Sequence, residues 1–203
     1  GLGAAQLAYQ HSASYARERV QGRAPTGPEN PEAVADSILV HPDVRRMLLT
    51  QRAYAEGCRA LGFYVGMQLD LAKYADDAQA QRIGELLTPV VKAFLTDRGL
   101  ECAVLGQQVL GGHGYVKEWG MEQIVRDARI GQIYEGANGI QAIDLVGRKV
   151  VRDGGQTLKE LIDEIIATDV DDEFAPALRD VCERLTAVTE SVVNRSKQDP
   201  NLP

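Results

Sequence analysis

Residues 43–69 read DVRRMLLTQRAYAEGCRALGFYVGMQL, and this stretch decides the expected fold class. Its apolar side chains recur every three or four positions, the spacing that places them on one face of an α-helix. That face consists of Val44, Leu48, Ala55, Cys58, Leu61, Val65 and Leu69. We therefore expect a long helix over about 42–74, which ends at the polar hinge of residues 74–77 and buries one face against other helices.

The same periodicity continues on both sides of this stretch. It predicts further helices over about 2–20, 79–110, 117–129, 138–151, 157–168 and 174–195. A loop rich in proline and glycine, GRAPTGPENPEA, follows the first helix at residues 22–33. The pair Thr88-Pro89 interrupts the second long helix, and it is compatible either with a helix start or with a kink.

These patterns predict an all-α protein. No segment alternates in the way of a strand, and only 5% of the residues are aromatic, so aliphatic side chains and alanine have to supply the packing. We expect an up-down four-helix bundle over residues 1–151, with extra C-terminal helices over residues 152–203.

Composition narrows the functions that the chain could serve. The net charge of −7 would repel a phosphate backbone, which disfavours nucleic acid as a partner. The apolar runs are far shorter than the ~20 residues that span a bilayer, so we expect a soluble protein with no membrane partner. Arg17, Arg19 and Arg23 form a basic cluster that is typical of a solvated helix end.

The cysteines and histidines point to neither disulfides nor a metal. Cys58, Cys102 and Cys182 lie far apart among apolar helical residues, which predicts buried thiols in a reducing compartment, namely the cytoplasm. The chain has three histidines, and none stands at a ligand spacing from another, so no metal site is expected.

Three stretches are too specific to be explained by helix packing: QVLGGHGY at 108–115, RDARI at 126–130 and QIYEGANGIQ at 132–141. In this order they resemble the closing motifs of the acyl-CoA dehydrogenase family. YARER at 15–19 resembles the first helix of that family's C-terminal domain, so the resemblance covers about residues 1–150. GRAPTGP, VHPDVRRML and YEG-x-NGIQ are most similar to the larger members, of the 3-methylmercaptopropionyl-CoA dehydrogenase type.

The resemblance implies that Glu135 is the catalytic base of a flavoprotein that dehydrogenates acyl-CoA thioesters to 2,3-enoyl-CoA. The α-proton of a thioester is a very weak acid, so its base has to be ionised, desolvated and within hydrogen-bond reach. Gly136 permits a sharp turn beside Glu135, and a helix that starts near Asn138 would favour the charged carboxylate through its dipole. A glutamate in this position can also be a simple helix cap, but the two upstream motifs favour the catalytic role.

The same resemblance implies FAD as the cofactor, with contacts from Arg19, Gln108, Gly111, Gly112, Ala137 and Gly139. Arg19 matches the arginine that pairs with the flavin pyrophosphate, for which a guanidinium fork is suited. Gln108, Gly111 and Gly112 match the segment beside the adenosine, where glycine permits close backbone approach. Taken alone, these residues would indicate a surface arginine and a helix stop.

Other positions match the family less fully. Tyr134 and Gly136 match substrate-binding positions. Their alternatives are turn geometry and a packed aromatic, and for Tyr134 the alternative explains the residue equally well. Ala137 stands where the family usually has threonine, and Pro42 and Gly139 where many members have glutamine, so these side-chain contacts to the flavin differ.

The stretch before the base suggests a structural pair and leaves two side chains without a role. Arg126 and Asp127 are expected to form an ion pair that holds the turn before Glu135. His113 and Trp119 receive no assigned role.

The resemblance also implies partners and further domains. Family members carry a helical N-terminal domain and a β-domain that covers the flavin ring, so we expect this chain to be one domain of a longer protein, inactive alone. Electron-transfer flavoprotein is the expected electron acceptor, and a homodimer or homotetramer is the expected assembly.

Two hypotheses from other classes stay open beside the enzyme. One is a catalytically silent helical assembly module that lacks the flavin-covering domains, which the gene upstream of Gly1 would distinguish. The other is a DNA-associated homologue, which would need a strongly basic C-terminal region. Residues 151–203 carry more Asp and Glu than Lys and Arg, which disfavours it.

Overall fold

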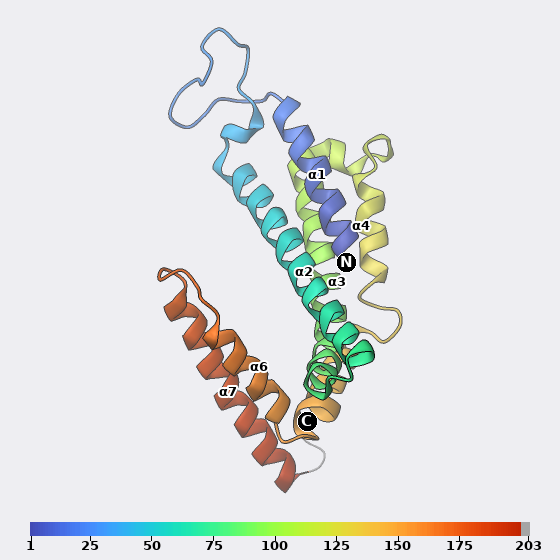
Figure 1. Cartoon of the computed structure of the whole chain (residues 1–203). Helices are drawn as coiled ribbons and strands as arrows, with labels where there is room; N and C mark the ends of the chain where they lie inside the picture. The colour runs from blue at the N-terminus through green and yellow to red at the C-terminus, as the bar shows by residue number, and fades with distance from the viewer. Residues whose placement is uncertain (200–203) are drawn as a thin grey trace. The chain divides into compact units, whose positions relative to one another are not determined.

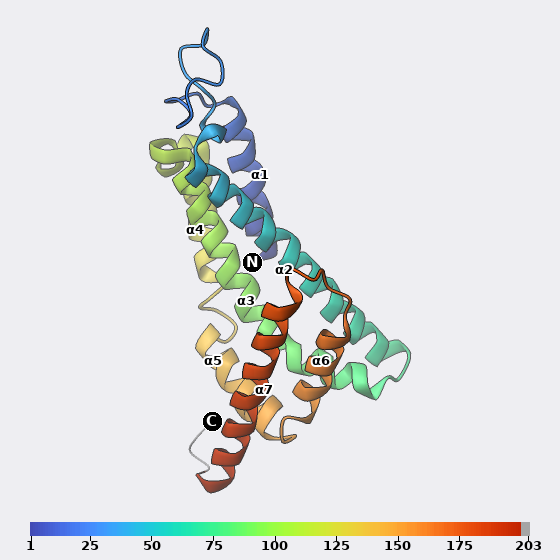
Figure 2. The same cartoon turned by 90° about the vertical axis from the view of Figure 1, so that its left-hand side faces the viewer.

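The computed structural model describes residues 1–199, which are mostly helical (Figures 1 and 2). Within this range the α-helices are α1 Leu2–Glu18, α2 Pro42–Tyr74, α3 Ala78–Leu110, α4 Met121–Ile130, α5 Asn138–Ile143, α6 Gln156–Ala167 and α7 Ala175–Gln198. Short 3-10 helices lie at Ile38–Val40, Gly111–Tyr115 and Lys117–Trp119, and a π-helix covers Asp144–Val151. The only β pairing in residues 1–199 is an isolated bridge between Val20 and Ser37. The predicted all-α class is confirmed.

The first of two compact units comprises residues 1–62 and 92–137. It contains α1, the first part of α2, the second part of α3, and α4. Successive helices of this unit run in alternating directions (Figure 1), so the predicted up-down four-helix bundle is confirmed. Its core is built mainly of small or flexible side chains from all four helices, among them Ala5, Ala8, Ala16, Met47, Ala55, Cys102, Ala103, Met121 and Ala128.

Close packing in this bundle depends on Gly106 of α3. A Cβ added there would lie 2.9 Å from Ser12 Oγ of α1 and 3.0 Å from Met121 Cε of α4. Ser12 is itself buried, with its hydroxyl 2.6 Å from Ala8 O and 3.2 Å from Gln51 Oε1. The three helices therefore meet with no room for another side chain, which explains a core of alanine rather than aromatic residues.

The second unit comprises residues 63–91 and, in the described part of the chain, 138–199. Here Arg82 Nη2 of α3 lies 3.0 Å from Glu160 Oε2 of α6. Tyr64 of α2 donates to the Glu164 carboxylate of α6, with oxygen distances of 3.0 and 3.1 Å. Burial and the Glu164 carboxylate raise the pKa of Tyr64 to about 12, so the phenol remains the donor at neutral pH.

The C-terminal part of this unit contains the extra helices that the sequence predicted. The π-helix contacts both α6 and α7, and α6 packs on α7. The boundary between residues 151 and 152 stays a prediction, and residues 200–203 lie outside the described part of the chain.

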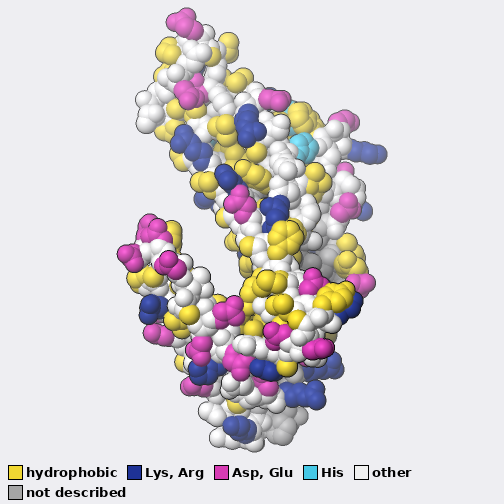
Figure 3. Space-filling model, viewed as in Figure 1, with side chains coloured by type: hydrophobic (Ala, Val, Ile, Leu, Met, Phe, Trp, Pro, Cys, Tyr) yellow, Lys and Arg dark blue, Asp and Glu magenta, His cyan; other side chains and the backbone are white. Residues whose placement is uncertain are grey.

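Large hydrophobic side chains are exposed along the second half of α2. They recur at helical spacing, as Phe63, Met67, Leu71 and Tyr74. Figure 3 shows hydrophobic side chains gathered on the surface where this part of α2 lies. An apolar helix face of this kind normally contacts another surface.

Three predicted helices differ in detail from those observed. α3 continues through Pro89 from Ala78, so of the two alternatives left open at this proline the helix start is excluded. Burial of Ile83 and Leu86 holds the turns before the proline in place, although proline lacks the backbone donor. The helix predicted at 117–129 is interrupted at Gly120, whose φ of +70° is left-handed. The segment 138–151 begins as α5 and continues as the π-helix rather than as one α-helix.

The cysteines are buried free thiols, as predicted. Burial raises the pKa of the Cys102 thiol to about 12 and that of Cys58 above its ordinary value, so both are poor nucleophiles. No helix within residues 1–199 has the length and apolar character needed to cross a bilayer. No group of three or more His, Cys, Asp or Glu residues in the same range could hold a metal ion.

Candidate functional site

A groove of about 570 Å³ lies in the first unit, where the C-terminal ends of α1 and α3 meet the loop between α1 and α2. We call it the Arg19 groove. It is lined by Tyr15, Arg19, Gln21, Gly22, Ile38, His41, Val44 and residues 108–113. The structure therefore brings together Arg19, Gln108, Gly111 and Gly112, which the sequence predicted as cofactor-binding residues.

Glycines shape the wall that α3 contributes. Gly111 has a φ of +58°, in the left-handed region that glycine tolerates, and it ends α3 as predicted. A Cβ at Gly111 or Gly112 would meet nothing within 4 Å, so the backbone is open to the groove. A Cβ at Gly114 would lie 2.3 Å from Gln107 O, because the chain folds back onto α3 there. Gln107 Nε2 donates to Gly114 O at 3.1 Å.

Tyr15 and His113 form another side of the groove, and Trp119 stacks on His113; sequence reasoning missed this aromatic cluster. Tyr15 Oη and His113 Nδ1 are 2.9 Å apart. The rings of His113 and Trp119 stack, with centroids 4.7 Å apart and an interplanar angle of 7°. With Arg19 they also line an adjoining hollow of about 410 Å³. The available signal was the four-residue spacing of Tyr15 and Arg19, which places both on one face of α1.

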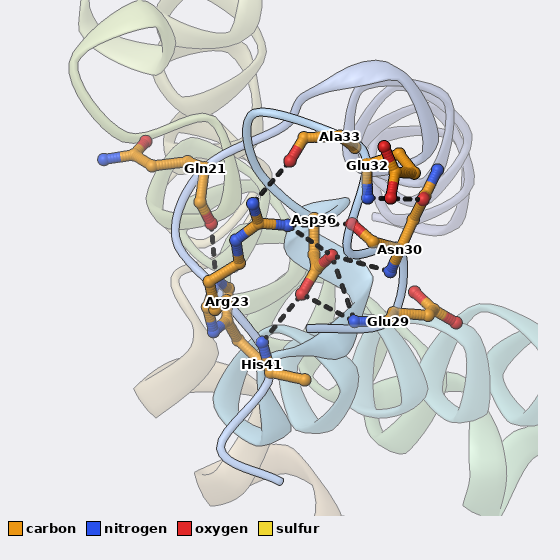
Figure 4. Close-up of polar contacts among 9 residues, drawn as sticks. Gln21, Arg23, Glu29, Asn30, Glu32, Ala33, Asp36 and His41 are labelled. Carbon is orange, nitrogen blue, oxygen red and sulfur yellow. Dashed lines mark hydrogen bonds and ion pairs between the residues drawn. The ribbon is translucent and has the colours of Figure 1, made fainter. Parts of the chain in front are cut away.

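The loop between α1 and α2 is organised by the buried carboxylate of Asp36 (Figure 4). Asp36 accepts hydrogen bonds from the backbone N–H groups of Ala24, Glu29 and Asn30, at 3.0–3.3 Å. These donors, Ala24 first, lower the pKa of Asp36 despite its burial. Arg23 Nη1 lies 3.3 Å from Asp36 Oδ1, so Arg23 holds the loop and is not the solvated residue that we predicted. A buried carboxylate needs such partners.

The ordered loop presents polar groups to the groove. Gln21, Gly22 and His41 line it, and His41 Nε2 lies 2.8 Å from Gln21 O. Arg19 ends α1, and its exposed guanidinium lies 3.4 Å from Gln21 Oε1. Most of the N–H donors of the Arg19 guanidinium therefore remain available to a bound anion.

A second candidate feature follows α4. The chain turns over residues 131–137, where Glu135 has a φ of +50° and Gly136 a φ of +84°. A left-handed backbone is unfavourable for glutamate, and such strain concentrates at functional sites. Tyr134 is 51% exposed, and Glu135 is exposed as well.

The turn follows the C-terminal end of α4, whereas the segment Gly111–Tyr115, part of which lines the Arg19 groove, precedes its N-terminal end (Figure 1). α4 has 10 residues, which corresponds to a rise of about 15 Å. Gly136 and Ala137 complete the turn, whereas Gly139 lies in the first turn of α5, in the second unit.

Gln132 attaches the turn to α3. Its Nε2 donates to Asp97 Oδ1 at 2.7 Å, and its Oε1 accepts from Arg129 Nη1 at 2.7 Å. Next to it, a Cβ at Gly131 would lie 3.1 Å from Thr96 Cγ2, so the backbone approaches α3 closely. No local pattern in the sequence points to Asp97, which is 35 positions away.

The ion pair predicted between Arg126 and Asp127 is absent from the described residues. Adjacent residues on a helix point in different directions, which explains why the two do not meet. Asp127 Oδ1 instead accepts from Gln123 Nε2 at 2.7 Å, one turn earlier on α4.

Comparison with known proteins identifies the family to which this chain belongs. The model of the acyl-CoA dehydrogenase C-terminal domain matches residues 1–150. An all-α bundle with this match is an acyl-CoA dehydrogenase C-terminal domain, and the chain belongs to the acyl-CoA dehydrogenase family.

Within the family, the predicted similarity to the larger members is confirmed. The 3-methylmercaptopropionyl-CoA dehydrogenase of Ruegeria pomeroyi is 44% identical over 212 aligned residues, which cover 99% of this chain and 36% of that protein. The chain thus spans about a third of the length of the curated relatives that it matches.

Solved structures share the fold. Caenorhabditis elegans ACDH-11 in complex with C11-CoA aligns with a TM-score of 0.80 at 17% identity, covering 98% of this chain and 32% of that one. An acyl-CoA dehydrogenase complexed with FAD from Bacillus anthracis aligns with a TM-score of 0.61 at 22% identity, covering 86% and 31%.

Proposed function

We propose that the full-length protein is an FAD-dependent acyl-CoA dehydrogenase that converts an acyl-CoA thioester into the 2,3-enoyl-CoA, with Glu135 as its base. The observation that carries this proposal is the left-handed backbone of Glu135, within the QIYEGANGIQ stretch of a chain that belongs to this family. A silent assembly module would give no reason to keep a strained glutamate there.

The proposed role of Glu135 is to take the α-proton of the thioester. The α C–H bond breaks, its proton goes to a carboxylate oxygen, and its electron pair forms the new double bond as hydride leaves the β-carbon. The side chain is exposed in this chain, so we infer that the acyl chain and the rest of the full-length protein dehydrate it. Loss of water disfavours the charged carboxylate and thereby strengthens the base.

The lining of the Arg19 groove fits the nucleotide side of FAD. The Arg19 guanidinium suits a pyrophosphate, and the Gln108 amide can donate to or accept from the polar edges of an adenosine. Open backbone at Gly111 and Gly112 permits close approach. FAD, when bound, supplies the acceptor for the hydride of the β-carbon.

The remaining site residues are assigned by their place in the turn. Ala137 and Gly139 would meet FAD through their backbone, because neither carries a polar side chain. Tyr134 and Gly136, on either side of Glu135, would contact the acyl-CoA. The half-exposed ring of Tyr134 leaves apolar surface for an acyl chain.

We also propose a setting for the enzyme. Electron-transfer flavoprotein would reoxidise it, and it would act in the cytoplasm as a homodimer or homotetramer. Buried free thiols support a reducing compartment, and the net charge of −7 argues against nucleic acid as a partner.

The substitution Glu135→Gln in the full-length protein tests the proposed base. An amide has nearly the shape of the carboxylate, so the fold, FAD content and acyl-CoA binding should persist. An amide cannot take the α-proton, so reduction of the flavin by acyl-CoA should slow by roughly 10²–10⁴-fold. Stopped-flow absorbance at saturating substrate, over a panel of acyl-CoAs, measures this rate.

A matched control is Glu183→Gln, at an exposed position of α7 in the other unit. It should leave the rate of flavin reduction unchanged. A Glu135→Gln protein that still reduces its flavin within a factor of ten of wild type would remove Glu135 from the mechanism.

A further inference from the structure

Both ends of the Gln132 side-chain amide are engaged, and with opposite charges. The nitrogen faces the Asp97 carboxylate of α3, and the oxygen faces the Arg129 guanidinium of α4, each at 2.7 Å. A reversed amide would put donor against donor and acceptor against acceptor, so the contacts fix its orientation. The position therefore calls for glutamine, because a glutamate would place two carboxylates in contact.

This amide lies three residues before Glu135, in the turn whose backbone is left-handed. A backbone hydrogen bond from Tyr134 N to Ile130 O, at 3.1 Å, continues α4 into this turn. Ile133 and Tyr134 are both about half exposed, so their burial contributes little. A left-handed Glu135 favours relaxation of the turn unless the surroundings oppose it.

We propose that Gln132 is a positioning residue, which ties the turn to α3 through Asp97 and so sets the place of the Glu135 carboxylate during proton removal. The proposal rests on the proposed function of Glu135. Base-to-substrate geometry is sensitive, and a displacement of about 1 Å can slow an enzyme by roughly 100-fold. Gln132 touches neither substrate nor cofactor in this scheme and acts through the turn.

A charge-exchange experiment in the full-length enzyme tests this role. Gln132→Glu sets a carboxylate against Asp97 and should slow flavin reduction by roughly 10–100-fold, with FAD content and half-saturating acyl-CoA concentration little changed. Asp97→Asn keeps an acceptor oxygen for Gln132 and should stay near wild type. In the double variant Gln132→Glu with Asp97→Asn, the amide at position 97 can donate to the carboxylate at position 132. Most of the lost rate should therefore return.

Amide hydrogen exchange over residues 131–137 provides a readout that does not depend on catalysis. Exchange should accelerate in Gln132→Glu and return toward wild type in the double variant. Wild-type rates in Gln132→Glu, or a double variant as slow as that single one, would overturn the positioning role. A Glu135→Gln enzyme that reduces its flavin at the wild-type rate would instead overturn the proposed function. The exchange data would then still show whether Gln132 attaches the turn to α3.

Discussion

Arg19 occupies a position where a single charge can hold a ligand without taking part in chemistry. It ends α1, its side chain is exposed, and the residues that line the groove with it include no Asp, Glu, Lys or second Arg. The turn of Glu135 lies beyond the far end of α4. Binding and proton removal are thus assigned to separate parts of the same unit.

Arg19→Ala and Gln108→Ala should therefore weaken retention of FAD by the full-length protein more than they slow flavin reduction. Loss of one charge-assisted contact should cost ~1.5–3 kcal/mol of binding, or roughly 10–150-fold in affinity. FAD release followed by equilibrium dialysis measures the loss. Arg17→Ala is the control, since Arg17 is exposed on the same helix but does not line the groove.

Equal FAD affinity in the wild-type, Arg19→Ala and Gln108→Ala proteins would assign both side chains to the surface. A loss of similar size in Arg17→Ala would indicate a general effect of positive charge instead.

At this scale the sequence predicted the residues that belong to motifs and missed those that meet only on folding. Arg19 and Gln108 stand in recognisable stretches, and the fold brings them to one groove. The contact between Tyr15 and His113 spans 98 positions, so no local pattern reports it. Asp36 was missed for a related reason, because its partners are backbone N–H groups of a loop without periodicity.

Among the elements, the 3-10 helix Gly111–Tyr115 shows how two nearby glycines serve different purposes. Gly114 is required by packing, since a Cβ would lie 2.3 Å from Gln107 O. Gly112 has space around its Cα and no positive φ, so its lack of a side chain matters only to what enters the groove.

Gly114→Ala should destabilise the chain by about 1–3 kcal/mol, the usual cost of overpacking against backbone. Gly112→Ala should change stability by no more than about 0.5 kcal/mol. Urea unfolding followed by circular dichroism compares the two midpoints. Equal midpoints would mean that the turn shifts freely and does not depend on the small size of residue 114.

Helices were predicted well because a stripe of apolar residues is a local property. The bounds of α2 and the end of α3 follow from the stripe at 44–69 and from Gly111. Pro89 was ambiguous because the burial of Ile83 and Leu86 on the preceding turns, which decides the outcome, is tertiary. The π-helix at Asp144–Val151 has the composition of an α-helix, so nothing in its sequence distinguished the two.

At the scale of the whole molecule, the chain supplies one face of the proposed cofactor site. Its contribution is the Arg19 groove and the turn after α4, while it spans about a third of its relatives' length. The apolar face of Phe63, Met67, Leu71 and Tyr74 on α2 is exposed in this chain.

The 203-residue chain should consequently purify without colour. The chain contacts only the nucleotide half of FAD in this proposal, so the flavin ring would remain in water. A cofactor held this weakly dissociates during gel filtration. Visible absorbance of the eluted peak, compared with that of the full-length protein, checks this. A peak that retains stoichiometric yellow FAD would show that the chain holds the ring by itself.

The left-handed backbone of Glu135 has a consequence for how the protein tolerates change. Glycine and asparagine adopt that conformation more readily than glutamate, so either would relieve strain at this position. Such substitutions would yield a more stable protein that lacks the proposed catalytic base. Selection for stability alone would therefore replace glutamate at this position, and only selection for catalytic activity would retain it.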